Sequence, residues 1–238
     1  DGTTVIMRYT LRLLAAQQFT RASTLICACE YIRRDCEARR SRYPSYTLGK
    51  KPITIGLWIG GEHTPNKNKA AGDCLKNLQN ATTYNLEYAK EKYNKFQVLK
   101  CPWCGTRLVK EKTDSKKIRG EFGYQMRSGN HFRLFCTRQA CDFSRELPVQ
   151  IVDEELYRDP PTLLFGTVDK FAMLPWNGEI GNFFAVENNN RAPELIIQDE
   201  LHLISGPLGT IVGLYESAID ALCWKKGSIT KIVASTAT

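Results

Sequence analysis

The sequence predicts an α/β protein whose mainly parallel sheet is covered by helices on both faces and carries an inserted subdomain. Short apolar segments with the length of strands alternate with helical patterns, which is typical of parallel sheets that are buried on both faces. Residues 96–150 interrupt this alternation with paired cysteines and many basic residues. The chain of 238 residues is long enough for one large domain with such an insertion. We therefore expect residues 1–95 and 151–238 to form one domain around an insertion at 96–150.

The part of the chain before the insertion contains two predicted strands, each followed by a helix. The segment "TTVIMRY" (3–9) is the first strand, and apolar spacing over 10–40 predicts a long amphipathic helix. The segment "ITIGLWIGG" (53–61) is the second strand; it ends in a glycine pair, and a loop and a helical stretch over 70–95 follow. The positions that follow the i, i+3, i+4 rule in the first helix are Leu11, Leu14, Ala15 and Gln18, then Ala22, Leu25, Ile26 and Cys29.

The part after the insertion contains three further predicted strands. Residues 163–171 form a strand that runs into a turn, and residues 193–199 form a strand that leads into two adjacent acids. A helix over 207–224 precedes the last strand, at 230–236. Ligands of doubly wound sheets lie beyond the carboxyl ends of the strands, so the acids occupy a position where a ligand site is expected.

Charge is unevenly distributed along the chain, which has a net charge of +8. The first 150 residues contain 27 basic and 13 acidic side chains, whereas the remaining 88 contain 6 and 12. This asymmetry predicts a polyanionic partner for the basic part, and the acids near residue 200 could serve a metal ion. Ordinary solvated surface charge remains the alternative.

Targeting signals are absent from the sequence. No apolar run approaches the roughly 18 residues that a membrane span requires, and the first residues show neither an initiator Met nor a signal peptide. Nine cysteines are an odd number for a disulfide framework and favour a reducing compartment. We therefore expect a cytoplasmic protein without membrane contact, and a chain that is a fragment of a longer one.

Four cysteines in the insertion predict a structural zinc site of the zinc-ribbon type. The segments "CPWCG" and "CTRQAC" provide Cys101 with Cys104 and Cys136 with Cys141. Four thiolates complete a tetrahedral Zn²⁺ site and leave no open position for catalysis. Two alternatives remain: the four thiols could bind no metal, or His131 could replace one of the cysteines as a ligand. Basic and aromatic residues between the two pairs could bind nucleic acid or could form a solvated hairpin.

The segment "LIIQDELHLISG" (195–206) places Asp199, Glu200 and His202 directly after an apolar strand. In nucleotide hydrolysis the first acid would hold Mg²⁺ and the second would position and deprotonate the attacking water. A pair of acids is weak evidence by itself. Its context is stronger, because a second strand ends in the hydroxyl-rich "STAT" about 35 residues later, within reach of the acids and of His202.

Five short elements, in the correct order, resemble the first motor domain of superfamily 2 nucleic-acid helicases. Leu201 replaces the usual alanine of the D-E-A-D-type box, and the spacing of the first element is one residue too long. The ordered set spans nearly the whole chain and is more specific than any single match. The matching residues are Thr10 and Arg12 for P-T-R-E-L-A-x-Q, Gly60 and Gly61 for the glycine doublet, Thr167 and Lys170 for T-P-G-R, Asp199 to His202 for D-E-x-H, and Thr236 to Thr238 for S-A-T, with Ser235 as the alternative to Thr236.

This resemblance implies a RecA-like domain of an ATP-dependent helicase or translocase. It implies that Asp199 binds Mg²⁺, that Glu200 activates water, and that His202 couples nucleotide state to a second motor domain of the same parent protein. Thr236 and Thr238 would link hydrolysis to strand movement. The residues implied to face the phosphates of one strand, DNA with single-stranded character, are Thr10, Arg12, Gly60, Gly61, Thr167 and Lys170. Segments such as "TVDKFAMLPW" and "QDELHLISGPLGT", with the cysteine insertion, are most similar to helicases of bacterial DISARM antiphage systems, which implies antiviral defence and a protein partner in a defence complex.

One expected element is missing from the sequence. No G-x-x-x-x-G-K-[ST] loop occurs, although this loop normally cradles the phosphates of ATP. We therefore expect a motor fragment that is nearly inactive in isolation and whose parent protein hydrolyses ATP. Two alternatives remain: a non-catalytic zinc-ribbon domain that binds nucleic acid on a motor-like sheet, and a metal-dependent nuclease that uses Asp199 and Glu200. The nuclease would need further carboxylates, and no recognisable set is present.

Overall fold

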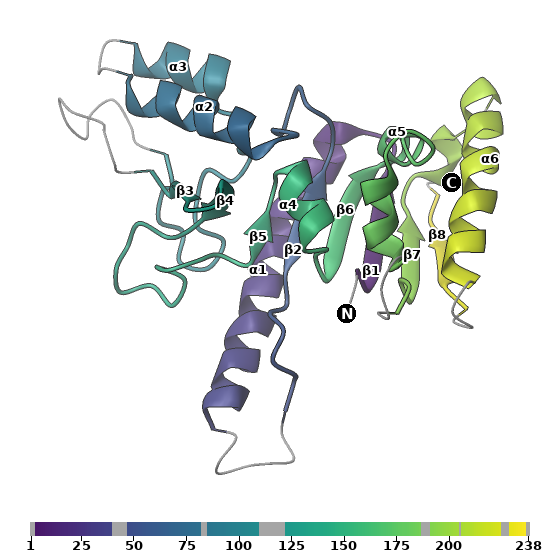
Figure 1. Cartoon of the computed structure of the whole chain (residues 1–238), viewed down its shortest axis with the longest axis horizontal. Coiled ribbons are helices and arrows are strands. Elements are labelled where there is room, and N and C mark those ends of the chain that lie inside the picture. The colour runs from purple at the N-terminus through teal and green to yellow at the C-terminus, as the bar shows by residue number, and fades with distance from the viewer. Residues whose placement is uncertain are drawn as a thin grey trace.

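The predicted α/β class with a parallel sheet is confirmed. The computed structural model describes residues 3–39, 47–81, 85–109, 122–186, 191–204, 206–224 and 229–236. Six strands form one parallel sheet in the order β5-β2-β6-β1-β7-β8 (Figure 1). These strands are β1 (Val5–Tyr9), β2 (Ile55–Trp58), β5 (Val149–Gln150), β6 (Leu163–Thr167), β7 (Leu195–Gln198) and β8 (Lys231–Ala234).

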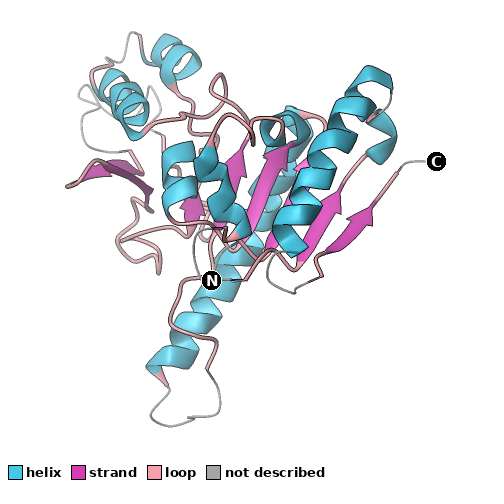
Figure 2. Cartoon of the chain, turned by 45° about the vertical axis from the view of Figure 1, so that its right-hand side comes forward, coloured by secondary structure: helices cyan, strands magenta, loops and turns pink. Residues whose placement is uncertain are grey.

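Helices cover both faces of this sheet (Figure 2). The longest, α1, packs on one face, and α4, α5, α6 and the short 3-10 helix η1 lie on the other. Side chains of each strand alternate between the two cores: Phe165 stacks on Tyr9 in the first core, at a ring distance of 5.6 Å, whereas Leu164 belongs to the second. The helical elements are α1 (Arg12–Ala38), α2 (Asn68–Gln79), α3 (Leu86–Tyr93), α4 (Asp153–Arg158), α5 (Val168–Phe171), η1 (Gly178–Phe184), η2 (Leu201–Leu203) and α6 (Gly206–Trp224).

The buried face of α1 differs from the one that the apolar spacing predicts. Leu11 and Leu25 were expected on it, yet they are 55% and 63% exposed. Polar residues take part instead, because the carboxylate of the fully buried Glu30 accepts hydrogen bonds from Arg33 and Arg34 and from a backbone N–H. Apolar spacing alone therefore predicts the wrong buried face for α1. The buried residues of α1 are Ala15, Phe19, Ser23, Ile26, Cys27, Glu30 and Arg33.

The described residues 68–81, 85–109 and 122–148 form a second lobe beside the sheet, here called the cysteine lobe (Figure 1). Its hairpin consists of β3 (Tyr124–Arg127) and β4 (His131–Leu134), which pair in antiparallel register. Helix α2 packs against both strands of the hairpin and against α3. The lobe thus includes two helices that the sequence grouped with the sheet, whereas β5, at the end of the predicted insertion, pairs with β2 of the sheet.

Candidate functional site

The parallel sheet brings the predicted site residues to one edge, because the carboxyl ends of all its strands point the same way. Asp199 follows β7, and Ser235 and Thr236 follow the neighbouring β8. The predicted nucleic-acid residues lie at or after the ends of β1, β2 and β6, which are also neighbours. We call this row of strand ends the carboxyl edge.

Asp199 is fixed in place by hydrogen bonds at the start of the D-E-x-H box. Its N–H donates to the carbonyl of Arg8 at 3.0 Å, and its Oδ1 accepts from the Glu200 N–H at 3.0 Å and from the Ser235 hydroxyl at 2.6 Å. Among the described residues, none donates to its Oδ2. Glu200 has a φ of +52°, a left-handed conformation that turns the chain sharply after the strand. The half-buried carboxylate therefore keeps one oriented oxygen for a hard cation such as Mg²⁺.

His202 connects the box to the end of β8. Its Nδ1 lies 3.1 Å from Thr236 Oγ1 and 3.3 Å from Glu200 Oε2. The backbone supports this contact, since the Leu201 N–H donates to the carbonyl of Ser235 at 2.9 Å. Residues 34 to 36 positions apart in the chain are thus joined directly at the carboxyl edge.

The hydroxyl-rich segment after β8 divides its contacts between the acid and the histidine. Ser235, which the sequence left as the alternative to Thr236, contacts Asp199, and Thr236 contacts His202. Thr238, the other predicted hydroxyl residue of this element, lies outside the described residues. The close approach of Ser235 to Asp199 makes it a candidate site residue that the motif match placed second.

A buried charge beneath this site was not predicted from the sequence. Arg8 of β1 is 2% exposed, forms an ion pair with Glu216 of α6, and lies 5.8 Å from the centre of the Phe171 ring. Next to it, burial and the Asp199 carboxylate raise the pKa of Tyr9 to about 12, so the phenol is neutral at physiological pH. The only sequence signal for this ion pair is a basic residue within an apolar strand.

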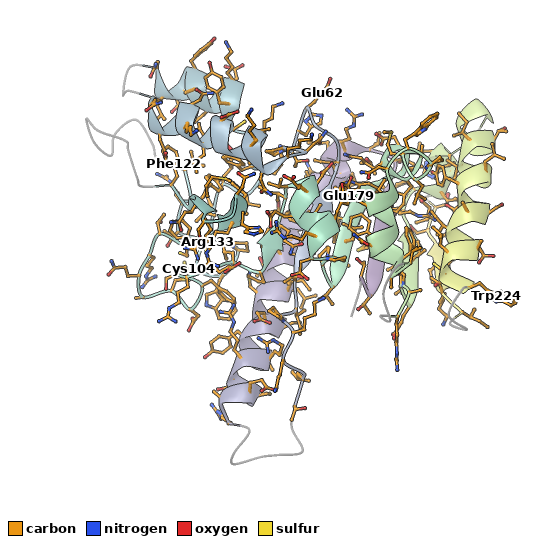
Figure 3. All side chains as sticks on the ribbon, viewed as in Figure 1. Glu62, Cys104, Phe122, Arg133, Glu179 and Trp224 are labelled. Carbon is orange, nitrogen blue, oxygen red and sulfur yellow. The ribbon has the colours of Figure 1, made fainter. Side chains whose placement is uncertain are left out.

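Arg12 links three of the predicted nucleic-acid elements. Its guanidinium lies 3.4 Å from Asp169 and 3.7 Å from Glu62, the latter labelled in Figure 3 in the loop after β2. Gly60 in that loop has a φ of +98°, which favours glycine.

The two predicted threonines are less accessible than Arg12. The side chain of Thr167 is fully buried and that of Thr10 is half-buried, and the hydroxyls of both are buried without a partner among the described residues.

Lys170 lies in a more enclosed position than its predicted role suggests. Its side chain is 12% exposed, and its Nζ lies 2.6 Å from Asp153 Oδ2 and 5.5 Å from the centre of the Trp58 ring. Burial raises the pKa of Asp153, and the Lys170 ammonium opposes this shift. Nothing in the sequence identified Asp153 as a candidate site residue, since acidic residues are common in the first turn of a helix.

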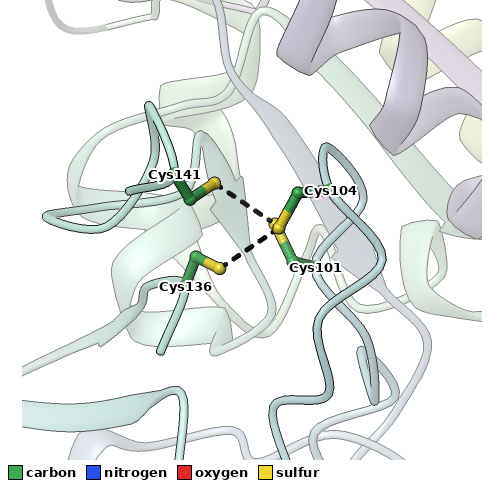
Figure 4. A group of neighbouring side chains, drawn as sticks. All are labelled: Cys101, Cys104, Cys136 and Cys141. Atoms are coloured by element: carbon green, nitrogen blue, oxygen red, sulfur yellow. Dashed lines mark hydrogen bonds between the residues drawn. The ribbon is translucent and has the colours of Figure 1, made fainter. Parts of the chain in front are cut away.

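The four predicted cysteines converge in the cysteine lobe (Figure 4). Their sulfur atoms lie within 4.8 Å of one another, with Sγ distances of 3.5 Å between Cys104 and Cys136 and 4.0 Å between Cys101 and Cys141. Tetrahedral Zn²⁺ with sulfur ligands at about 2.3 Å would place the sulfurs about 3.8 Å apart. The arrangement therefore fits a zinc ion. His131 is not part of the cluster; its Nδ1 lies 3.4 Å from Glu155.

Local turns set this geometry. The N–H of Gly105 donates to the Cys101 carbonyl at 2.9 Å, and Gly105 has a φ of +75°. Burial opposes ionisation of Cys104, yet hydrogen bonds from Thr106 and from neighbouring thiols lower its pKa to about 6. Burial raises the pKa of Cys141 to about 11. A divalent cation would replace the thiol protons and hold all four sulfurs as thiolates.

Helix α1 packs against two loops, the first carrying Cys101 and Cys104 and the second carrying Cys136 and Cys141. Tyr31 stacks on Trp103 of the first loop at a ring distance of 5.2 Å, and Arg34 lies 4.8 Å from the centre of the Phe143 ring in the second. Burial, followed by the charges of Cys101 and Cys141, raises the pKa of Cys27 to about 12. Helix α1 thus contacts both the sheet and the loops that carry the cysteines, a connection that no motif indicated.

Comparison with known proteins shows that the chain belongs to the family of the DISARM protein DrmA. No protein-family model matches the chain. The chain is 36% identical to the DISARM protein DrmA of Bacillus paralicheniformis over 93% of its own length. The matched part is 21% of that relative, so the chain spans about a fifth of the relative's length. Within the described residues, none of the helices has the length and apolar character that crossing a membrane would require.

Proposed function

From its relationship to a DISARM protein and from the hydrogen-bonded acids at the carboxyl edge, we propose that this chain is the first motor domain of a DExH-type helicase or translocase in bacterial antiphage defence. Its parent protein would couple ATP hydrolysis to movement along nucleic acid, DNA with single-stranded character. The observation that carries the proposal is the direct contact of the D-E-x-H box with the end of β8, through Asp199 with Ser235 and through His202 with Thr236.

The contacts of Asp199 and Glu200 support distinct roles. Hydrogen bonds to one oxygen of Asp199 hold its carboxylate in a single orientation, so its other oxygen would contact Mg²⁺ or the water around it. Bound Mg²⁺ would neutralise the developing phosphate charge. Glu200 would position a water molecule and accept its proton, and the nearby His202 would orient the glutamate.

Other parts of this motor would come from outside these residues. The sequence contains no G-x-x-x-x-G-K-[ST] loop, so a phosphate cradle for ATP would be supplied elsewhere in the parent protein. We likewise assign the second motor domain, and a protein partner in a defence complex, to the parent protein. The contact between His202 and Thr236 would carry the nucleotide state toward that second domain.

Nucleic acid would bind along the neighbouring strand ends. Backbone N–H groups around Gly60 and Gly61, together with Arg12, lie beside one another there and suit phosphate contacts without sequence preference. The fully buried hydroxyl of Thr167 would leave only its backbone for such a contact. Zn²⁺ would be held by the four cysteines as a structural ion of the cysteine lobe.

The substitution Glu200→Gln tests the proposal in the protein that contains this chain. We expect ATP turnover stimulated by single-stranded DNA to fall at least about 100-fold, since a general base contributes roughly 10² to 10⁴ in rate. Binding of Mg²⁺-ATP should persist. Glu194→Gln is the matched control, because Glu194 precedes the other end of β7 and its side chain is 61% exposed.

Unchanged turnover in Glu200→Gln would remove this residue from the role of general base. A wild-type protein that binds single-stranded DNA without hydrolysing any nucleotide would favour the non-catalytic zinc-ribbon alternative. Metal-dependent cleavage of the DNA would favour the nuclease. The three outcomes are measured in the same samples.

A further inference from the structure

A cavity of about 250 Å³ lies next to the predicted nucleic-acid edge. It is enclosed by the start of α2, by α4, by α5 with the turn that follows it, and by η1, whose Glu179 is labelled in Figure 3. Asp153 and Tyr157 line it from α4, Lys170 lines it from α5, and Met173 lines it from the turn after α5. Of these lining residues, only Lys170 belongs to a motif that predicted function.

Asp153 and Lys170 place a hydrogen-bond acceptor beside a hydrogen-bond donor in the cavity. Asp153 is 2% exposed, and its Oδ2 accepts a hydrogen bond from Lys170 at 2.6 Å. The Oδ1 of Asp153 is buried and has no hydrogen-bond partner among the described residues. Tyr157 accepts a hydrogen bond from Trp58 Nε1 at 2.9 Å, so its own O–H proton can be donated. A buried carboxylate oxygen without a partner is costly and indicates a ligand or water that supplies an N–H or O–H.

The charge of the lining disfavours a phosphate in this position. Three carboxylates, those of Asp153, Glu154 and Glu179, face two ammonium groups, those of Lys67 and Lys170. An uncharged group that carries a donor beside an acceptor suits such a lining better. Nucleobases carry this arrangement on their exposed edges, and unstacked bases of single strands are commonly read there.

The cavity also lies where a base of a bound strand would reach it. A Cβ on Gly60 would lie 4.0 Å from the Lys170 side chain, and one on Gly61 would lie 2.9 Å from the side chain of Asn66, a lining residue. The loop that offers N–H groups to phosphates therefore borders the cavity directly. A base attached to a phosphate bound in that loop would therefore lie beside the cavity.

We propose that this cavity is a nucleobase subsite that takes one unstacked base of the bound strand. Asp153 Oδ1 accepts from the base, Lys170 donates to it, and Met173 packs against its face. The proposal rests on the proposed function, because it requires a single strand along the carboxyl edge. The bases all offer a donor beside an acceptor, so the subsite recognises the presence of a base more than its identity.

An abasic scan of single-stranded DNA tests the subsite. A fluorescent oligonucleotide with one abasic site at successive positions is titrated with the protein, and fluorescence anisotropy gives the affinity for each. We expect one position at which loss of the base weakens binding about 10-fold, with little effect at its neighbours. An oligonucleotide series with equal affinities at all positions would overturn the subsite while leaving strand binding intact. Absence of any binding would instead overturn the proposed function on which it rests.

The substitution Asp153→Asn connects the scan to the cavity. The amide oxygen of asparagine would turn toward Lys170, so a donor would replace the free acceptor. We expect affinity for intact DNA to fall about 10-fold and the effect of the sensitive abasic position to vanish in this variant. Asp220→Asn makes the same chemical change at an exposed residue of α6 and should keep the wild-type scan.

A second variant keeps the test decisive if the buried Asp153→Asn fails to fold. Met173 is 47% exposed at the rim, so Met173→Trp can fill the cavity from its edge without removing a buried group. It should also abolish the abasic effect. A folded Met173→Trp protein that keeps the wild-type scan would refute the subsite.

Discussion

The cysteine cluster and the carboxyl edge are built in opposite ways. The four cysteines come from residues 101 to 141, their sulfurs lie within 4.8 Å, and tight turns place each pair. The carboxyl edge collects residues at the ends of five strands, from Thr10 to Thr236, and the contacts between its segments are single hydrogen bonds after β7 and β8 and ion pairs of Arg12. A site made of local turns can be identified from spacing alone. A site made of strand ends depends on the order of strands in the sheet.

The two regions also differ in how their interactions contribute to stability. Three buried thiols and the half-buried Cys104 around a cation would be a closed unit whose ion adds much of the folding free energy of its lobe. The contacts of Asp199 with Ser235 and of His202 with Thr236 are exposed, and each contributes little to folding. We therefore expect loss of structure when the cluster is broken and loss of activity when the edge is broken.

The largest effect is expected from Cys101→Ser. Zinc content should fall from about one ion per chain to near zero, and unfolding should become easier by several kcal/mol, since structural zinc contributes on the order of 10 kcal/mol in small domains. Metal analysis by mass spectrometry and chemical denaturation measure both. Cys36→Ser, on α1 and outside the cluster, is the control and should keep the metal. Wild-type protein without zinc, when purified without chelator, would contradict a metal-bound cluster.

A smaller effect is expected in α1, which contacts both regions. Glu30→Gln leaves the buried Arg33 without its counter-ion and should lower the free energy of unfolding by about 3 to 5 kcal/mol at neutral pH. Asp35→Asn, which breaks the exposed pair with Arg39 on the same helix, should cost less than about 1 kcal/mol. Equal effects of the two substitutions would show that the buried network does not support α1.

The difference in stability between wild type and Glu30→Gln should depend on pH, and the direction follows from the pKa of Glu30. Burial opposes its ionisation, but hydrogen bonds from Arg33, Ile53 and Arg34 outweigh burial and lower the pKa below its ordinary value. Its stabilisation is therefore fully present above the ordinary glutamate pKa of about 4.3 and is lost as pH falls through the lowered value. Urea unfolding should show the gap between wild type and Glu30→Gln closing in acid. A gap independent of pH would exclude this carboxylate as its cause.

The smallest effect on stability is expected at the carboxyl edge. Ser235→Ala removes the hydroxyl that donates to Asp199 and should change the free energy of unfolding by less than about 1 kcal/mol, because the contact is exposed. ATP turnover of the parent protein should nevertheless fall about 10-fold, which corresponds to about 1.4 kcal/mol in the barrier, because an Asp199 carboxylate that is no longer held in one orientation would position Mg²⁺ less well. Ser217→Ala, on an exposed turn of α6, is the control. A loss of stability without loss of turnover would reverse the contrast between the two regions.

The sequence predicted the strands more accurately than the surfaces of the helices. Five of the six strands of the sheet lie within predicted segments, because parallel strands are short apolar runs, a pattern that even the exposed β8 retains. The two-residue β5 is too short to give such a pattern. The buried face of α1 was misjudged at Leu11 and Leu25, since Glu30 and Arg33 satisfy each other's charges inside the core. Pairing between charges cannot be read from hydrophobic spacing.

The amino-acid pattern alone shows which chemistry is present: four thiols at zinc-site spacing, and acids, a histidine and hydroxyls placed after apolar strands. The three-dimensional fold then selects which of these groups meet. It paired Ser235 with Asp199, enclosed Lys170 with Asp153, and placed α2 and α3 on the cysteine lobe. The physical reason is that strand order in a parallel sheet is set by packing on both faces, so residues distant in the chain become neighbours without any local signal.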